Sequence, residues 1–235
     1  MNIIVTGASK GIGKSLVKSL ASTGSSTIIC IARSEDKLKK LKEECEKINP
    51  NSKIIPLPFD LENTELIKSQ LMNSVRDHFF SVDILINNAG YLRKIPLDKL
   101  SYQETLKHYK VNVFTPFEMI KSTLSLFHSS PVKHIVNIGT MGGMNGTEKF
   151  PGMAAYSSAK GALSILSELL VHELKDRKIH INYLALGAVE TDMFREAFTE
   201  EKAKLKPEDI AEFIAHFAKE EWKYFNGKII PVSLE

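Results

Sequence analysis

Short hydrophobic runs alternate along the chain with longer segments in which hydrophobic residues recur every three or four positions. Runs such as Ile28-Ile29-Cys30-Ile31 are continuously apolar, which is typical of strands buried on both faces. The pattern predicts strands at residues 3–5, 27–31, 54–57, 84–86, 134–138, 180–185 and 228–232. It predicts helices near residues 11–23, 35–48, 62–79, 99–127, 156–175 and 207–219.

This alternation of strands and helices defines the expected fold class. A strand followed by a helix and then by another strand forms a right-handed βαβ unit with parallel strands. Seven such strands predict an α/β fold: a doubly wound, seven-stranded parallel sheet with helices on both faces. We expect residues 1–235 to form a single domain, with its ligand crevice at the carboxyl ends of the strands.

Composition and charge exclude several functional classes. A hydrophobic fraction of 43%, a charged fraction of 25% and a net charge of +3 are ordinary for a globular domain and give no case for nucleic-acid binding. The sequence has no apolar run of about 18 residues to span a membrane, and no room for a secretory signal before Gly7. Cys30 and Cys45 have neither metal-site nor CxxC spacing. We therefore expect a cytoplasmic protein with no metal site, nucleic-acid partner or membrane anchor.

A glycine-rich turn, Thr6-Gly-Ala-Ser-Lys-Gly-Ile-Gly13, joins the first predicted strand to the first predicted helix. Its glycines permit a tight turn and a close approach of phosphate to the backbone, and a helix N-terminus favours an anion. Glycines also form ordinary strand–helix turns, but this position favours a dinucleotide site. We assign cofactor binding to Gly7, Ser9, Lys10, Gly11, Ile12 and Gly13.

Two basic residues bear on the choice of cofactor. Lys10 lies inside the turn, and Arg33 follows the second strand, where Ala32 replaces the acidic residue that would bind a ribose 2′-hydroxyl. Two cations at this place would attract a 2′-phosphate, although both could instead be solvated surface groups. We predict NADP(H) in preference to NAD(H). Further cofactor contacts are expected from Asp60, Leu61, Asn88, Ala89 and Gly90.

Tyr156 and Lys160 lie four residues apart, on one face of a predicted helix. The lysine ammonium, together with an oxidised nicotinamide, is expected to lower the phenol pKa from its ordinary value of about 10. Tyr156 can then act as a general acid in reduction and a general base in oxidation. Thr140 offers a hydroxyl to orient the carbonyl, and Asn112 could hold a water that connects Lys160 to solvent.

Each of these residues also has an ordinary structural interpretation. A YxxxK spacing occurs in many helices, Thr140 alone would be a loop threonine, and Asn112 alone would be a helix-capping or kink residue. Their occurrence in one chain with the glycine turn favours the active-site interpretation.

These motifs resemble those of the short-chain dehydrogenase/reductase family, in the compact branch with a TGxxxGxG turn. The resemblance extends over nearly the whole chain, including Asp60-Leu61, residues 87–90 and residues 187–193. It implies a Rossmann-type fold and NAD(P)(H)-dependent oxidoreduction. It also implies a catalytic tetrad, here Asn112, Thr140, Tyr156 and Lys160. Additional cofactor contacts implied by the resemblance come from Tyr156, Lys160, Val189 and Thr191.

The sequence departs from the family pattern at the substrate side. Thr140 stands where the family has serine, and its extra methyl group stiffens the side chain and narrows the pocket. The usual Pro-Gly after the sixth strand reads Leu186-Gly187, and the short segment 194–206 suggests an open site or a modest substrate. We expect the pocket to be lined by Tyr91, Leu92, Met141, Met144, Phe150, Met153, Met193, Phe194 and Phe198, although some of these could pack against the core instead. Such a lining favours an apolar or aromatic ketone or aldehyde.

The main functional hypothesis is an NADP(H)-dependent carbonyl reductase that interconverts a carbonyl and an alcohol by hydride transfer. The alternative is a non-catalytic NADP(H)-binding sensor or scaffold on the same fold. A sugar-nucleotide epimerase or dehydratase ranks last, because it would need a larger C-terminal substrate domain. Family members usually assemble through the central and catalytic helices, so we expect a homodimer or homotetramer. In the catalytic helix, the stripe Ala159, Leu163, Leu166 and Leu170 faces either the core or a partner subunit.

Overall fold

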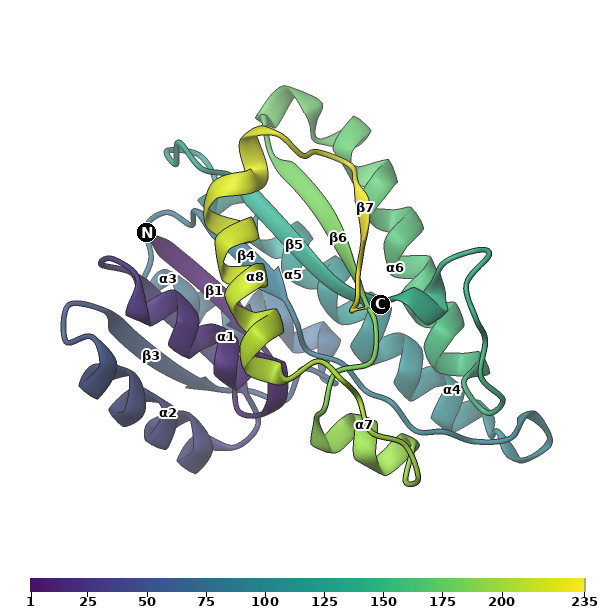
Figure 1. The fold of residues 1–235 in the computed structure, drawn as a ribbon. Coiled ribbons are helices and arrows are strands. Elements are labelled where there is room, and N and C mark those ends of the chain that lie inside the picture. The colour runs from purple at the N-terminus through teal and green to yellow at the C-terminus, as the bar shows by residue number, and fades with distance from the viewer. Residues whose placement is uncertain (235) are drawn as a thin grey trace.

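All seven predicted strands form and join in one parallel sheet. The structure is a computed structural model that describes residues 1–234 (Figure 1). The strands are β1 (Asn2–Thr6), β2 (Thr27–Ala32), β3 (Lys53–Pro58), β4 (Ile84–Asn87), β5 (His134–Thr140), β6 (His180–Leu186) and β7 (Ile229–Val232). Their order is β3-β2-β1-β4-β5-β6-β7, and every neighbouring pair is parallel. The order reverses between β1 and β4, and this switch point is where a doubly wound sheet opens a crevice.

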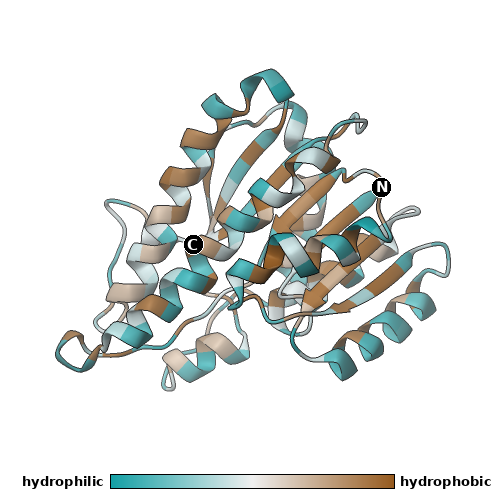
Figure 2. Cartoon of the chain, turned by 180° about the vertical axis from the view of Figure 1, so that it is seen from behind, coloured by the Kyte–Doolittle hydropathy of each residue, from teal (hydrophilic) through white to brown (hydrophobic). Residues whose placement is uncertain are grey.

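Helices cover both faces of the sheet, as Figures 1 and 2 show from opposite sides. One face is covered by α1 (Gly11–Ser22), α2 (Glu35–Ile48) and α8 (Pro207–Glu220), which pack Leu16, Leu41 and Ile214 into one core. The other face is covered by α3 (Met72–Arg76), α5 (Thr115–Thr123) and α6 (Ala154–Glu173), while α4 (Tyr102–Tyr109) packs on α6. The predicted Rossmann-type doubly wound arrangement is confirmed.

Alternate residues of one strand supply the two cores. Ile3 and Val5 point into the core under α1 and α8, whereas Ile4 points into the opposite core, and all three are fully buried. Full burial of such a side chain contributes about 1.5–3 kcal/mol, which explains why the central strands are continuously hydrophobic. In Figure 2 the strands are mostly brown, while the helices mix teal and brown along their length.

Two long predicted helices are each divided into shorter pieces. The segment predicted at 99–127 contains α4, a π-helical turn at Lys110–Phe114 and α5. Asn112 lies in this π turn and donates its side-chain amide to the His108 carbonyl, and Pro116 has no N–H to continue the ladder. The segment predicted at 62–79 likewise has a 3-10 turn and a π turn before α3.

Residues 194–206 are more ordered than the sequence suggests. A short helix, α7 (Asp192–Ala197), begins here, and Thr191 caps it by accepting a hydrogen bond from the Phe194 N–H. Glu190 pairs with Arg195 and accepts from the Ala203 N–H, while Val189 bridges Leu205. This segment therefore contains a helix and has defined hydrogen bonds, while the open site or modest substrate expected from its length stays a prediction. Among residues 1–234, no helix combines the length and apolar character needed to cross a bilayer.

Candidate functional site

A cavity of about 680 Å³ lies at the carboxyl ends of the strands, beside the switch point. Every predicted site residue except Asn112 lines it. These residues are Gly7, Ser9, Lys10, Gly11, Ile12, Gly13, Arg33, Asp60, Leu61, Asn88, Ala89, Gly90, Thr140, Tyr156, Lys160, Val189 and Thr191. The cofactor turn and the Tyr–Lys pair, which are about 150 residues apart in sequence, therefore share one cavity.

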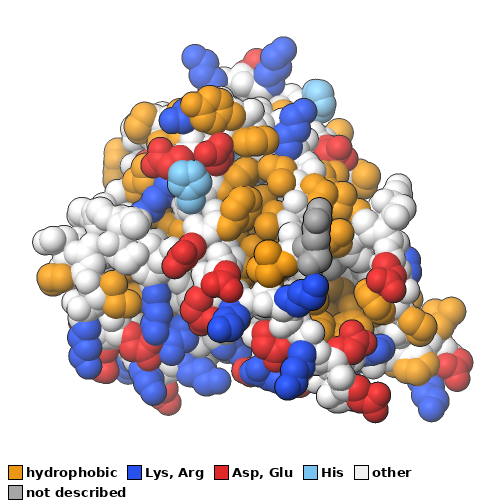
Figure 3. All heavy atoms as spheres, in the orientation of Figure 1, with side chains coloured by type: hydrophobic (Ala, Val, Ile, Leu, Met, Phe, Trp, Pro, Cys, Tyr) orange, Lys and Arg blue, Asp and Glu red, His pale blue; other side chains and the backbone are white. Residues whose placement is uncertain are grey.

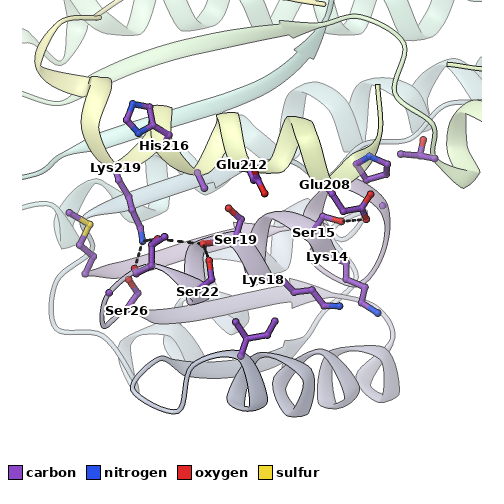
Figure 4. A pocket seen from close by; sticks show the side chains of 18 of the residues that line it. Lys14, Ser15, Lys18, Ser19, Ser22, Ser26, Glu208, Glu212, His216 and Lys219 are labelled. Atoms are coloured by element: carbon purple, nitrogen blue, oxygen red, sulfur yellow. Dashed lines mark hydrogen bonds between the residues drawn. The ribbon is translucent and has the colours of Figure 1, made fainter. Parts of the chain in front are cut away.

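A second hollow, of about 1070 Å³, lies between α1 and α8 (Figure 4). Its polar side chains connect the two helices: Ser15 donates to Glu208 at 3.1 Å, and Lys219 donates to the Thr23 carbonyl at 2.8 Å. These contacts join neighbouring helices, and Gly11 is the one residue from 7–13 that lines this hollow, whereas six of these residues line the first cavity. We therefore take the 680 Å³ cavity as the candidate active site, although it is the smaller of the two.

The glycine turn has the backbone that a phosphate cradle requires. Gly7 and Gly11 have φ angles of +68° and +52°, a region that residues with a side chain rarely adopt. Gly13 is needed for space, because a Cβ there would lie 2.2 Å from the Gly7 carbonyl oxygen. The N-terminus of α1 has no side-chain cap, so its backbone N–H groups are available to an anion.

The segment after β4 is joined directly to this turn. Thr6 Oγ1 accepts the N–H groups of Asn88 and Ala89, both at 3.0 Å. The Asn88 amide donates in return to the carbonyls of Thr6, at 3.0 Å, and Gly7, at 3.3 Å. Any Cβ at position 7 would lie 2.8 Å from the Ala89 Cα. The glycine turn and the segment after β4 are therefore held together in one wall of the cavity.

Besides Lys160, four cations line the cavity. One of them, Lys107, is paired with Glu62 at 3.0 Å, and the other three come from the glycine turn and the segment after β2. Lys10 and Arg33 lie there as predicted, and Lys37, on the first turn of α2, joins them. Sequence reasoning missed Lys37, although its place one turn after Ser34 was a usable signal, because Ser34 caps α2 and accepts from the Lys37 N–H. The positive charge favours a ligand that carries an additional phosphate at this end.

The electrostatics of Tyr156 and Lys160 differ from the expectation. Burial, with a contribution from Tyr183, raises the pKa of Tyr156 above its ordinary value, so the expected lowering by Lys160 is not found. Burial also lowers the pKa of Lys160 to about 8, which weakens it as a permanent positive charge. The Lys160 ammonium donates to the Ile138 carbonyl at 2.8 Å. In this state the phenol stays protonated at neutral pH, as a proton donor must be.

Thr140 lies where β5 ends and the chain turns toward α6. Its hydroxyl accepts from the Gly142 N–H at 3.3 Å, and its own N–H donates to the Tyr183 hydroxyl at 3.2 Å. The turn after it, Met141–Gly143, packs against α6, because a Cβ at Gly143 would lie 2.9 Å from the Gly161 nitrogen. Thr140 is thus held on the same side of the cavity as the catalytic helix.

Asn112 lies behind the cavity rather than in its wall. Its amide donates to the Tyr91 carbonyl at 2.8 Å and to the His108 carbonyl at 3.0 Å, while its oxygen accepts the Tyr91 N–H at 3.2 Å. It is also near the catalytic lysine: a Cβ on Gly90 would lie 3.3 Å from its oxygen and 3.8 Å from Lys160 Nζ. The visible role of Asn112 is to bend the helix and hold the segment after β4; a water relay stays a prediction.

The substrate end of the cavity is mostly apolar. Eight of the nine predicted lining residues are present: Tyr91, Leu92, Met141, Phe150, Met153, Met193, Phe194 and Phe198. The prediction for Met144 is wrong, because this side chain packs against the buried cluster of Leu163, Tyr183 and Ala185. Phe198 stacks on Phe194 and meets Phe150 edge to face, which builds an aromatic wall.

The residues present fit a dinucleotide with a nicotinamide. The turn leaves a cradle that any side chain at Gly7 or Gly13 would fill, and Lys10, Arg33 and Lys37 line the same cavity. Asp60, Leu61, Val189 and Thr191 line the same cavity, and their contacts with the cofactor stay predictions. Tyr156 lines the same cavity as this cradle.

The comparisons with known proteins agree with this geometry. A family model described as short chain dehydrogenase matches residues 1–202. The chain is 30% identical over 240 residues to 3-oxoacyl-(acyl-carrier-protein) reductase FabG of Salmonella typhimurium, covering 98% of this chain and 94% of that protein. It is 31% identical over 225 residues to an NADP-dependent 3-hydroxy acid dehydrogenase of Schizosaccharomyces pombe, covering 90% and 84% of the two chains.

Solved structures show the same fold. A short-chain dehydrogenase/reductase from Serratia marcescens superposes with a TM-score of 0.86 at 25% identity, covering 98% of this chain and 95% of that chain. A blue fluorescent protein from a metagenomic library, solved in complex with NADPH, also gives 0.86 at 25% identity, with 99% and 96% covered. The chain therefore belongs to the short-chain dehydrogenase/reductase family of oxidoreductases.

Proposed function

We propose that this protein is an NADP(H)-dependent carbonyl reductase for an apolar or aromatic ketone or aldehyde. The observation that carries the proposal is the shared cavity: Tyr156, Lys160 and Thr140 line the same space as the glycine turn. A cofactor cradle alone would suit a sensor. A half-buried phenol and a buried ammonium in the same cavity supply what a proton transfer needs.

Tyr156, Thr140 and Lys160 have different roles in the proposed reduction. A nicotinamide cofactor, when bound, supplies the hydride that reaches the carbonyl carbon. Tyr156 donates its phenolic proton to the carbonyl oxygen, which becomes the alcohol hydroxyl. The Thr140 hydroxyl donates a hydrogen bond to that oxygen and stabilises the negative charge that develops on it. Lys160, with a pKa of about 8, can exchange a proton with its surroundings near neutral pH.

Three cations support the preference for NADP(H). Arg33 can form a bidentate contact with a phosphate, while Lys10 and Lys37 contribute point charges. The Schizosaccharomyces pombe relative is named NADP-dependent, and the metagenomic structure holds NADPH. We expect Arg33→Ala to weaken NADPH binding by about tenfold to a hundredfold and to leave NADH binding within about twofold. Equal loss for both cofactors, measured by fluorescence titration, would contradict the assignment.

The decisive experiment compares wild type with Tyr156→Phe on a panel of aromatic and aliphatic ketones and aldehydes, following NADPH consumption. Loss of the proton donor should reduce turnover by about a hundredfold or more while NADPH still binds. Turnover that survives in the variant would remove Tyr156 from this role. Tight NADPH binding without turnover in either protein would instead favour the sensor or scaffold.

We also propose that the protein assembles as a homodimer or homotetramer. In α6 the predicted stripe belongs to the core, because Ala159, Leu163 and Leu170 are buried. A different pair, Ile165 and Leu169, is 64% and 53% exposed. A second apolar surface lies between α8 and β7, where Figure 3 shows hydrophobic side chains gathered. A monomeric mass by light scattering at micromolar protein would refute the proposal.

A further inference from the structure

A fully buried tyrosine connects the end of β5 to the catalytic helix. Tyr183 lies in the middle of β6, 0% exposed, with its ring directed toward α6 rather than toward the cavity. Its hydroxyl donates to the Lys160 carbonyl at 3.0 Å and accepts the Thr140 N–H at 3.2 Å. One oxygen atom therefore contacts the backbones of two predicted catalytic residues that lie on different elements.

The space for this contact exists because position 139 is glycine. Gly139 pairs with Ala185 in the sheet, and an ideal Cβ on it would lie 1.8 Å from Tyr183 Cζ and 2.0 Å from the Tyr183 oxygen. The ring packs in the buried cluster with Leu163 and Ala185, so a side chain at 139 would displace it from that cluster. The Tyr183 ring thus occupies the space that a side chain at position 139 would fill, and this lets its hydroxyl reach the Thr140 N–H.

These bonds hold Lys160 at both ends. Its ammonium donates to the Ile138 carbonyl at 2.8 Å, and its own carbonyl receives the Tyr183 hydroxyl. The residues on either side of Gly139 in β5 are therefore both connected to Lys160, one directly and one through the phenol. Without the phenol, the Thr140 N–H and the buried Lys160 carbonyl would lose a partner inside the core.

We propose that Tyr183 is a positioning residue whose hydroxyl fixes Thr140 relative to Lys160, and through α6 relative to Tyr156. The inference rests on the proposed reductase function, because the position of Thr140 relative to Tyr156 and Lys160 affects the rate only if these residues act on one substrate. A reaction that needs a proton donor and a hydrogen-bond donor on one carbonyl oxygen is sensitive to small displacements of either. Tyr183 touches neither the cavity nor the reacting atoms, so its effect is on geometry alone.

The test compares Tyr183→Phe with Tyr109→Phe. Both variants remove one hydroxyl that hydrogen bonds to α6, but the Tyr109 hydroxyl contacts Ser158 at 3.1 Å and neither Thr140 nor Lys160. Hydrogen–deuterium exchange of peptides that cover residues 138–143 reports the anchoring. Steady-state kinetics with NADPH and the best ketone of the panel report its consequence, and fluorescence titration gives the affinity for NADPH.

For Tyr183→Phe we expect faster exchange in residues 138–143, a kcat lower by about tenfold or more, and an unchanged KM for NADPH, within about twofold. Tyr109→Phe should match wild type in all three. Unchanged exchange in Tyr183→Phe, or a kcat within about twofold of wild type, would overturn the proposal. If wild type reduces no ketone of the panel, the reductase function fails, and the exchange result alone decides whether the hydroxyl anchors Thr140.

A second pair of variants separates the hydroxyl from the ring. Tyr183→Ala removes both, and adding Gly139→Ser places a new hydroxyl close to the vacated position, because the phenol oxygen lies 2.0 Å from an ideal Cβ at 139. We expect the double variant to recover protection of residues 138–143 relative to Tyr183→Ala. Protection that does not recover would show that ring packing holds the segment, and would overturn the role of the hydroxyl.

Discussion

The buried histidine at the start of β5 should make folding sensitive to mild acid. His134 is 0% exposed and lies at the amino end of the strand, away from the cavity. Its Nδ1 is 2.9 Å from the Ala218 carbonyl, and its Nε2 is 3.0 Å from the Asn182 amide nitrogen. This geometry suits the neutral ring, with a proton on Nδ1 only. A second proton on Nε2 would face a donor, since the Asn182 amide also donates to the Phe225 carbonyl.

The size of the effect follows from linkage. Burial, with a smaller contribution from His180, lowers the pKa of His134 to about 4, against about 6.5 for an unperturbed histidine. Between these values the unfolded chain binds more protons than the folded protein, so stability falls as the pH is lowered. At about 1.4 kcal/mol for each pKa unit, the loss is about 2 kcal/mol at pH 5 and approaches about 3 kcal/mol below pH 4.

Urea unfolding of wild type and His134→Asn at about pH 7.5 and pH 5 measures this loss. All other titrating groups are shared, so the difference between the two proteins isolates His134. Wild type should lose about 2 kcal/mol more than the variant on acidification. His128→Asn, at an exposed histidine, should behave as wild type. Equal acid loss in wild type and His134→Asn would refute the reasoning.

Three further outcomes are expected. Gly13→Ala should weaken NADPH binding by about tenfold or more in calorimetry, because its methyl carbon would lie 2.2 Å from the Gly7 oxygen. The control Gly24→Ala, which has open space around its Cβ, should bind NADPH as wild type does. Lys160→Met should abolish turnover. It should also raise the free energy of unfolding at pH 7 by about 1–3 kcal/mol, because burial disfavours the ammonium. A variant that urea unfolds more easily than wild type would contradict this. Asn112→Ala should speed amide exchange in residues 88–92 and lower the melting temperature by about 4 °C, and unaltered exchange there would argue against its holding role.

The parts of the molecule that depend on local order could be predicted from the sequence. Strand and helix periods arise within a few consecutive residues, so all seven strands and the glycine turn were found. Tyr156 and Lys160 share one helix, and their spacing alone places them on one face. Parallel strands place their carboxyl ends at one edge of the sheet, and this rule predicted that Thr140 and Arg33 lie near one crevice. Both residues line the same cavity.

Tertiary contacts decided the rest, because they join residues that are far apart in the chain. Asn112 holds the segment after β4 through its hydrogen bonds with Tyr91, and Met144 packs against a core cluster formed by another strand and helix instead of lining the predicted pocket. Burial, which no local pattern reports, set the direction of the pKa shift at Tyr156. The reason for glycine at 139 cannot be read from the sequence, because Tyr183 lies 44 positions further along the chain. Its ring comes to lie against Gly139 only when β5 pairs with β6.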